Sequence, residues 1–392
     1  KNNIQTKNTI SKEENIINEN VTTNENVEKS NNKLPVYSEE AKNKLKNLYK
    51  TNEKIAYLTF DDGPTTSVTP KILDILKEKA NSGLDVRVLY DDMGSFAMLP
   101  SNYPKLLEKY GIKCMQFNKL SPFAGIIMNN RDHRKMMIID GHTAFSGGIN
   151  ISDEYININS KLGVWKDNGI RIKGEAVWNF TVMFLEMWNS FKKEDNDYNK
   201  YKYNFTEKYK ENGFVVPYGE SPLDDVITGE DIYLNIINQA KKYVYIYTPY
   251  LIIDTDMINS LILAARRGVD VRIVVPGIPD KKIVYDLTSS YFYTLIKGGV
   301  KIYTYTNGFV HSKVFLSDDE IATVGTINLD YRSLYLHFEC GIYMKDTNVI
   351  KDIKKDFEDS FKESHKVDEK EAKNGLFKGL WQAILRLFAP MM

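Results

Sequence analysis

Short apolar runs separated by amphipathic stretches predict alternating strands and helices along most of this chain. Residues 54–60 (K-I-A-Y-L-T-F) have the composition of a short buried strand. Residues 68–80 place their apolar side chains on one helical face, and Gly83 ends that helix. Residues 85–90 (D-V-R-V-L-Y) are the next predicted strand. The predicted order is therefore strand, helix, strand.

The same order recurs in the second half of the chain. Residues 243–247 (Y-V-Y-I-Y) and 270–275 (D-V-R-I-V-V) are predicted strands, with a helix over 257–267 between them. The run G-L-D-V-R-V begins at residue 83, and G-V-D-V-R-I begins at residue 268. Because buried parallel strands need covering helices, the predicted fold class is α/β, a sandwich in two similar halves. The polar segment 193–212 between the halves is predicted to be a linker or surface excursion.

The two ends of the chain differ from this pattern. Residues 1–33 are rich in Asn, Lys and Glu without any period, which predicts a disordered tail or, alternatively, an interaction tail, with order beginning near Leu34. The sequence begins with Lys1 and no signal peptide precedes it, so we expect a processed or partial product. Residues 366–392 are predicted to contain an amphipathic helix over 375–389.

That C-terminal helix has an apolar stripe and a polar face. The stripe consists of Phe377, Leu380, Trp381, Ile384 and Phe388, and the polar face of Lys378, Gln382 and Arg386. Basic amphipathic helices with an interfacial Trp lie on anionic membranes, which is the function we predict for it. The alternative is a helix docked on the protein's own core.

Composition narrows the classes of function. The 52 basic and 52 acidic residues cancel, which argues against a general nucleic-acid binder. The two cysteines, Cys114 and Cys340, exclude a disulfide framework and a Cys-rich zinc site. No apolar run reaches the length of about 18 residues that a membrane-spanning helix needs.

Each half carries the same constellation of chemically active residues at the same spacing. The first set is His133, Lys135, Asp140, Gly147 and Asn150, and the second is His311, Lys313, Asp318, Gly325 and Asn328. Five shared positions in register are not a plausible accident, although a pair of ordinary core-edge histidines on duplicated strands is the structural alternative.

The residue types fit phosphoryl chemistry. His-x-Lys on a strand places both side chains on one face. A Lys ammonium suits a phosphate oxygen, a neutral His can attack phosphorus, and a protonated His can donate to a leaving oxygen. The amides of Asn150 and Asn328 can add hydrogen bonds to the phosphoryl oxygens. This scheme requires no metal and no cofactor.

The stretches H-R-K-M-M-I-I-D…G-G-I-N and H-S-K-V-F-L-S-D…G-T-I-N resemble the two signature motifs of the phospholipase D superfamily. Others, such as V-L-Y-D-D-M-G-S (88–95), T-P-Y (248–250) and N-L-D-Y-R-S-L-Y-L-H-F-E (328–339), resemble bacterial cardiolipin synthases. The resemblance runs from about residue 81 to the C-terminus. It implies two phospholipase D-type α/β sandwich halves, 81–215 and 216–365, facing each other across a shared active site.

The resemblance also implies a reaction. One His attacks the phosphodiester of phosphatidylglycerol, and the other protonates the departing glycerol and then activates a second phosphatidylglycerol. Which of the two is the nucleophile stays open. Glu339 matches the acid that orients the imidazole in the superfamily, Asp167 is its counterpart in the first half, and Asp140 and Asp318 resemble structural hydrogen-bond partners.

Residues 54–64 (K-I-A-Y-L-T-F-D-D-G-P) resemble the opening of polysaccharide deacetylases. In that family Asp61 would be the base and Asp62 a metal ligand, but no pair of the remaining histidines has the required H-x3-H spacing. We therefore expect no deacetylase activity. We interpret 34–80 as a truncated deacetylase-like strand and helix fused to the synthase-like part, with a fold that survives and an activity that is reduced.

The leading hypothesis is a cardiolipin synthase-type phosphatidyltransferase. The alternatives are a phospholipase D-type hydrolase, a nuclease of the superfamily, and a fusion remnant that binds membranes without turnover. The expected partners are phosphatidylglycerol and anionic membrane lipid, not nucleic acid. The expected location is peripheral, on the cytoplasmic face of the cell membrane.

Overall fold

The computed structural model describes residues 55–60, 63–95, 98–119, 129–158, 160–206, 209 and 212–391. The predicted tail, the predicted start of order near Leu34, and Asp61 and Asp62 lie outside these residues. All described residues belong to one compact unit.

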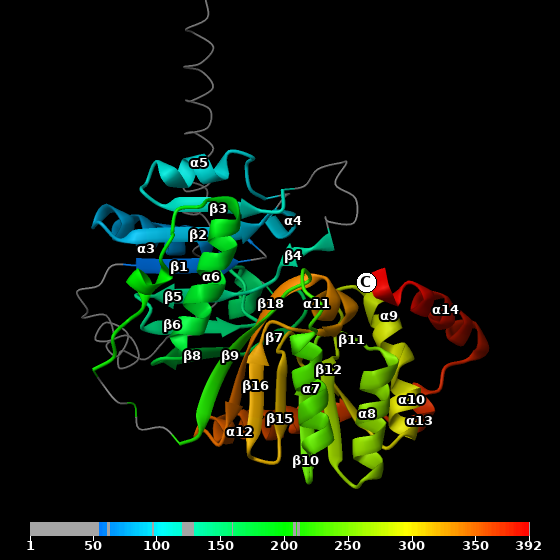
Figure 1. The fold of residues 1–392 in the computed structure, drawn as a ribbon. Coiled ribbons are helices and arrows are strands. Elements are labelled where there is room, and N and C mark those ends of the chain that lie inside the picture. The colour runs from blue at the N-terminus through cyan, green and yellow to red at the C-terminus, as the bar shows by residue number, and fades with distance from the viewer. Residues whose placement is uncertain are drawn as a thin grey trace, which may run out of the picture. The chain divides into compact units, whose positions relative to one another are not determined.

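A six-stranded mixed sheet forms the first half (Figure 1). The strand order is β3 (Lys113–Phe117), β2 (Asp85–Asp91), β1 (Ile55–Phe60), β5 (Met136–Ile139), β6 (Thr143–Gly147) and β8 (Gly169–Lys173). The first three strands are parallel, and β5, β6 and β8 continue the sheet antiparallel to their neighbours. The predicted strand, helix and strand are β1, α3 (Thr69–Asn81) and β2, which confirms that part of the sequence analysis.

The second half repeats this sheet. Its order is β19 (Ser364–Lys366), β13 (Lys301–Tyr305), β12 (Asp270–Pro276), β10 (Tyr243–Tyr247), β15 (Val314–Ser317), β16 (Ile321–Gly325), β18 (His337–Lys345) and β4 (Arg131–Asp132), with β9 (Phe214–Glu220) also paired to β18. β10 lies parallel to β12 and antiparallel to β15, as β1 lies parallel to β2 and antiparallel to β5. The predicted duplication of an α/β unit is therefore confirmed.

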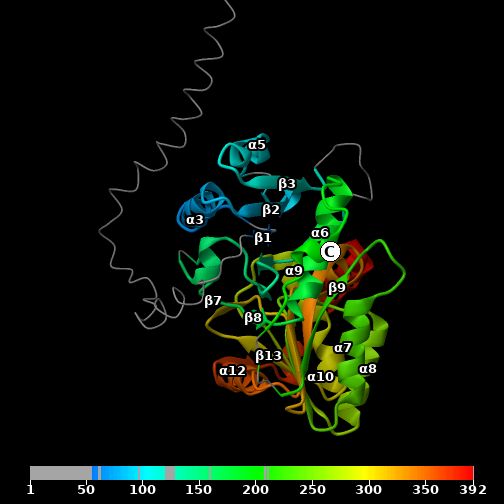
Figure 2. The ribbon, with the colours of Figure 1, turned by 60° about the vertical axis from the view of Figure 1, so that its left-hand side comes forward.

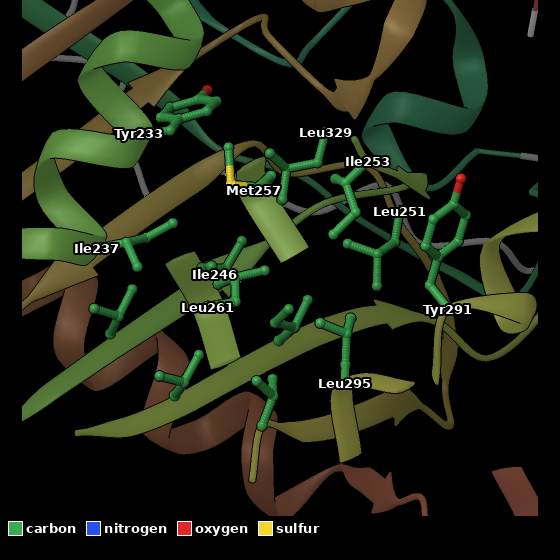
Figure 3. Packing of buried hydrophobic residues seen from close by; sticks show 14 of the residues in the cluster. Tyr233, Ile237, Ile246, Leu251, Ile253, Met257, Leu261, Tyr291, Leu295 and Leu329 are labelled. Atoms are coloured by element: carbon green, nitrogen blue, oxygen red, sulfur yellow. The ribbon is translucent and has the colours of Figure 1, made fainter. Parts of the chain in front are cut away.

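Helices cover both sheets. The helices are α4 (Asp92–Ser95), α5 (Tyr103–Glu108), α6 (Val177–Phe191), α7 (Thr228–Gln239), α8 (Thr255–Arg266), α9 (Lys282–Ser290), α10 (Phe292–Lys297), α11 (Tyr331–Tyr335), α12 (Ile350–Lys362), α13 (Glu369–Ala372) and α14 (Leu376–Leu387). Helices α3 and α5 pack on one face of the first sheet, and α7, α8 and α10 pack on one face of the second (Figures 1 and 2). Figure 3 shows the second of these layers, with Tyr233 and Ile237 of α7 and Met257 and Leu261 of α8 near Ile246 of β10.

A third apolar cluster joins the halves. Side chains alternate along β1, so Leu58 packs on the α3 side while Tyr57 belongs to the joining cluster. This cluster also holds Leu316 from β15, Phe184 from α6 and Phe357 from α12. Because one buried cluster includes both sheets, the halves share a hydrophobic core. That core fixes the strands that the His-x-Lys segments connect.

No helix in the described part of the chain is long and apolar enough to cross a bilayer.

Candidate active site

His133 and Lys135 lie in the extended connection from β4 to β5. β4 pairs with β18 of the second half, whereas β5 belongs to the first sheet, so this connection lies where the halves meet. The His133 N–H donates to the Phe338 carbonyl over 2.9 Å, and Lys135 Nζ donates to the His133 carbonyl over 2.7 Å. The prediction that His-x-Lys forms part of the strand was wrong, because β5 begins only at Met136, where pairing with β1 starts.

His311 and Lys313 occupy the corresponding place in the second half. β14 (Gly308–Val310) pairs in parallel with β7 (Val164–Lys166) of the first half, and the His311 N–H donates to the Lys166 carbonyl over 2.8 Å. Lys313 Nζ donates to the His311 carbonyl. A two- or three-residue strand pair across the interface thus positions each imidazole.

Each imidazole is held by a carboxylate from the opposite half. His133 Nδ1 lies 2.7 Å from Glu339 Oε1, and His311 Nδ1 lies 2.8 Å from Asp167 Oδ2. A carboxylate at Nδ1 accepts the N–H there, which leaves the Nε2 lone pair available for attack or proton uptake. Lys313 Nζ also lies 2.9 Å from His311 Nδ1. Both predicted acids therefore lie beside the predicted histidines. In each pair, the histidine comes from one half and the acid from the other.

The buried surroundings keep both imidazoles neutral at rest. Burial lowers the pKa of His133 to about 3, with the Glu339 charge opposing this shift and the Lys135 charge adding to it. Burial, and then the charge of Lys313, lowers the pKa of His311. A bound phosphodiester anion would raise both pKa values again, because a nearby negative charge favours the imidazolium.

The two lysine charges couple the sets into one site. Burial lowers the pKa of Lys313 to about 7, the Asp167 charge opposes this shift, and the Lys135 charge from the other half adds to it. Lys135 contributes in the same direction to the lowered pKa of His311, after burial and Lys313. The Lys135 charge therefore acts across the interface on both Lys313 and His311, and a bound anion would oppose this repulsion.

The two acids stay ionised. Burial alone would raise the pKa of Glu339, but the hydrogen bond from His133 Nδ1–H, together with the charge of Lys135, holds that pKa below its usual range. His311 has the same effect on the pKa of Asp167, again against burial.

Comparisons with known proteins agree with this geometry. A family model described as cardiolipin synthase, PLD-like (phospholipase D-like) domain, matches residues 43–188 and 233–361. The chain belongs to this family. It is 41% identical over 294 residues to cardiolipin synthase 1 of Staphylococcus aureus (strain MRSA252), covering 72% of this chain and 58% of that protein. It is 37% identical over 295 residues to the cardiolipin synthase of Halalkalibacterium halodurans, covering 75% and 58%.

An uncharacterised protein of Streptococcus mutans is 52% identical over 287 residues, covering 72% of this chain and 61% of that protein. The chain therefore spans about three fifths of the length of these curated relatives. The crystal structure of phosphatidylserine synthase from Haemophilus influenzae has the same fold, with a TM-score of 0.66, 17% identity, and 90% of this chain and 91% of that one covered. The PLD-type α/β fold of the two halves is thus established.

These findings give no support to the deacetylase-like fusion. The cardiolipin synthase family model already begins at residue 43 and includes residues 54–64. β1 also has the same neighbours in the first sheet as β10 has in the second. Tyr57 and Leu58 are both buried, so this strand is packed as an ordinary part of the family's fold.

The two aspartates of the PLD-type motifs lie at turns. Asp318 has a φ of 57° and accepts backbone hydrogen bonds from Lys241 (2.7 Å), Lys242 (2.8 Å) and Tyr243 (2.9 Å). Asp140 occupies the equivalent turn after β5 with a φ of 55°. The three hydrogen bonds to Asp318 anchor the start of β10, and they direct the Asp318 carboxylate to backbone N–H groups.

The two imidazoles have different surroundings. His311 contacts the rings of Tyr155 and Trp165, with centroids 5.2 and 5.3 Å away, and Asn150 Nδ2 donates to the Tyr155 hydroxyl over 2.9 Å. His133 instead lies beside a second imidazole, His337, with ring centroids 5.6 Å apart. The site therefore has aromatic rings around His311 and a second imidazole beside His133.

The residues that support the two acids differ as well. Gly148 faces Asp167, and a Cβ on Gly148 would lie 2.1 Å from Asp167 Oδ1. The corresponding position in the second half is Thr326, whose hydroxyl donates to Glu339 Oε2. Asn328 lies two residues further on and is buried.

Sequence reasoning missed His337, Arg332 and Thr326. His337 and Glu339 have the His-x-Glu spacing that places two side chains on one face of a strand, and this signal could have found His337. His133, His337 and Glu339 also offer ligand atoms within 4.8 Å of one another, so they could hold a metal. The hydrogen bond from His133 to Glu339 already explains their proximity, and the predicted absence of a metal stays a prediction.

Proposed function

We propose that this chain carries the catalytic part of a phosphatidyltransferase that makes cardiolipin from two phosphatidylglycerol molecules and releases glycerol. The crosswise pairing of His133 with Glu339 and of His311 with Asp167 carries the proposal, because it provides two neutral imidazoles, each paired with an acid and followed by a lysine two residues on. Membership of the cardiolipin synthase family supports the lipid substrate.

In the first step, Nε2 of one imidazole attacks phosphorus and forms a P–N bond while the P–O bond to glycerol breaks. The other imidazole, protonated in the presence of the bound anion, gives its proton to the departing oxygen. Lys135 and Lys313 stabilise the phosphoryl oxygens, and the nearby anion favours the ammonium form of Lys313. Asn150 and Asn328 are candidates for further hydrogen bonds to these oxygens.

In the second step, the imidazole that lost its proton takes one from the free primary hydroxyl of a second phosphatidylglycerol. The resulting oxygen attacks phosphorus, the P–N bond breaks, and the first imidazole returns to its neutral form. Two phosphatidylglycerol molecules thus give one cardiolipin and one glycerol, with no net proton change. If water took the place of the second lipid, the product would be phosphatidic acid.

The orientation of α14 supports a position at a membrane surface. Its polar face docks on α9: Gln382 Nε2 donates to the Asp286 carbonyl over 3.0 Å, and Arg386 Nε donates to Ser290 Oγ over 2.9 Å (Figure 1). Its apolar stripe faces outward, with 88% of Phe377 and 63% of Leu380 exposed.

We infer that this apolar face inserts into an anionic bilayer. Residues 373–392 contain three basic residues and no acidic one, in a chain whose net charge is zero. Arg386 is held on α9, but Lys373 and Lys378 are exposed beside the apolar stripe, which matches an anionic lipid surface. Hydrogen bonds to α9 hold the polar face of this helix on the protein, and the membrane function of the apolar stripe stays a proposal.

The direct test is an analysis of lipid products. Purified protein is incubated with phosphatidylglycerol vesicles, and His133→Asn and His311→Asn serve as controls. The proposal predicts cardiolipin and glycerol from the wild type and neither product from the variants. Phosphatidic acid alone would favour the hydrolase, and the absence of any product from folded, vesicle-bound protein would contradict the proposal.

A further inference from the structure

A third histidine lies beside His133 without a role in the reaction described above. His337 Nδ1 is buried and has no hydrogen-bond partner within the part of the chain that the structure describes. Glu339 Oε1 lies 3.8 Å from it and is already engaged by His133. A buried N–H without an acceptor is unfavourable, so a ligand that accepts from it would be favoured.

Arg332 extends this basic side of the site. It lies on α11, directly before β18, and its Nε donates to His337 Nε2 over 3.4 Å. This bond places the neutral imidazole's proton on Nδ1. Among the described residues, no acidic side chain forms an ion pair with Arg332. Asp330, two residues earlier, caps α11 by accepting from the Ser333 N–H over 2.9 Å.

The proposed reaction needs a second place for a phosphate. The reacting phosphodiester lies between the two imidazoles, but the acceptor lipid has a phosphodiester of its own, one glycerol unit away from the hydroxyl that attacks. The ring centroids of His133 and His337 are 5.6 Å apart, and one glycerol unit can span this distance. A hydrolase, whose acceptor is water, has no need of such a subsite.

We propose, on the basis of the proposed function, that Arg332 and His337 bind the phosphodiester of the acceptor lipid. Arg332 offers a planar fork of donors suited to phosphate oxygens, and the His337 imidazole adds a further N–H. The subsite would hold the acceptor with its free hydroxyl next to His133. It selects a second phospholipid over water or a free alcohol, so it determines the product.

Two assays on the same protein test this subsite. The first measures cardiolipin formed from phosphatidylglycerol, and the second measures exchange of labelled glycerol into phosphatidylglycerol, in which the acceptor has no phosphate. The variants are Arg332→Gln and His337→Gln. Arg266→Gln is the matched control, because Arg266 is exposed on α8. Circular dichroism melts confirm that each variant is folded.

The proposal predicts that the ratio of cardiolipin formation to glycerol exchange falls at least tenfold in Arg332→Gln, less in His337→Gln, and stays constant in the control. Equal losses in the two assays would show a general structural role and would overturn the proposal. An unchanged ratio would overturn it as well. If the wild type performs neither reaction, the proposed function itself fails, and this result is distinct from both others.

Discussion

Glu339 Oε1 lies 2.7 Å from His133 Nδ1, although the two residues are 206 positions apart and belong to opposite halves. Asp167 and His311 repeat the arrangement in the other direction, at 2.8 Å. Each half therefore provides the acid that orients the other half's imidazole. Neither half can form a complete site alone, since removing one acid disturbs the histidine across the interface.

Replacing either acid by its amide should reduce turnover without unfolding the protein. Asp167→Asn and Glu339→Gln keep the shape but remove the charge that fixes the Nδ1–H tautomer, so we expect kcat to fall by about 10²- to 10⁴-fold. The measurement is cardiolipin formation at saturating phosphatidylglycerol. Glu175→Gln, an exposed acid, is the control. Activity within twofold of the wild type in either variant would contradict the pairing.

Asp318→Ala should mainly affect stability. The change removes the acceptor of three backbone N–H groups before β10, so the free energy of unfolding should drop by about 2–4 kcal/mol. Urea unfolding measures this loss, and kcat per folded molecule should change far less than in Asp167→Asn. A thousandfold loss of kcat with normal stability would instead identify Asp318 as a proton carrier.

The protein should lose stability on acidification below about pH 6.5. Burial lowers the pKa of His133 to about 3 in the folded state, whereas an unfolded His titrates near 6.5, so between these values the unfolded chain binds more protons. His133 alone should therefore lower the free energy of unfolding by about 2 kcal/mol between pH 7 and pH 5. The lowered pKa of His311 acts in the same direction.

Urea midpoints at a series of pH values test this dependence. His133→Asn should flatten the pH dependence of stability, because it removes the group whose pKa burial lowers in the folded state. A wild-type stability that is constant from pH 7 to pH 5 would show that the imidazole is charged in the folded protein.

Charges on the outer face of α14 should release the protein from membranes. Phe377→Asp with Leu380→Asp opposes insertion, and we expect co-sedimentation with phosphatidylglycerol vesicles to fall at least tenfold. Leu263→Asp, on the exposed face of α8, is the matched control, since 53% of Leu263 is exposed. If the double variant instead sediments normally but changes from dimer to monomer, the face is a contact between copies of this chain.

The sequence was informative wherever a pattern is local. The strand over 243–247 matches β10 residue for residue, and the predicted strand over 54–60 differs from β1 by one residue. Both elements have a hydrophobic period that a short window reveals. The repeated spacing identified His133 and His311 as candidate site residues in the same way, because it needs only positions along the chain.

The crosswise geometry was not readable from the sequence. β4, β7 and β14 have only two or three residues, too few for a period, and yet their pairing across the halves positions both imidazoles. The amphipathic pattern of α14 distinguished two faces but did not tell which one docks. Gln382 and Arg386 face inward because α9 presents Asp286, Ser289 and Ser290 to them, a tertiary contact without a local signal.

The most direct test of the account is to trap the covalent intermediate. Protein mixed with phosphatidylglycerol labelled at phosphorus is quenched in alkali, where a P–N bond survives, and the labelled peptide is identified by mass spectrometry. The account predicts the phosphorus label on His133 or on His311, as a glycerophosphoryl group once alkali has removed the acyl chains, that acid releases, and no label when both are replaced by Asn. Cardiolipin formation with the label on another residue, or continued labelling of the double variant, would contradict it.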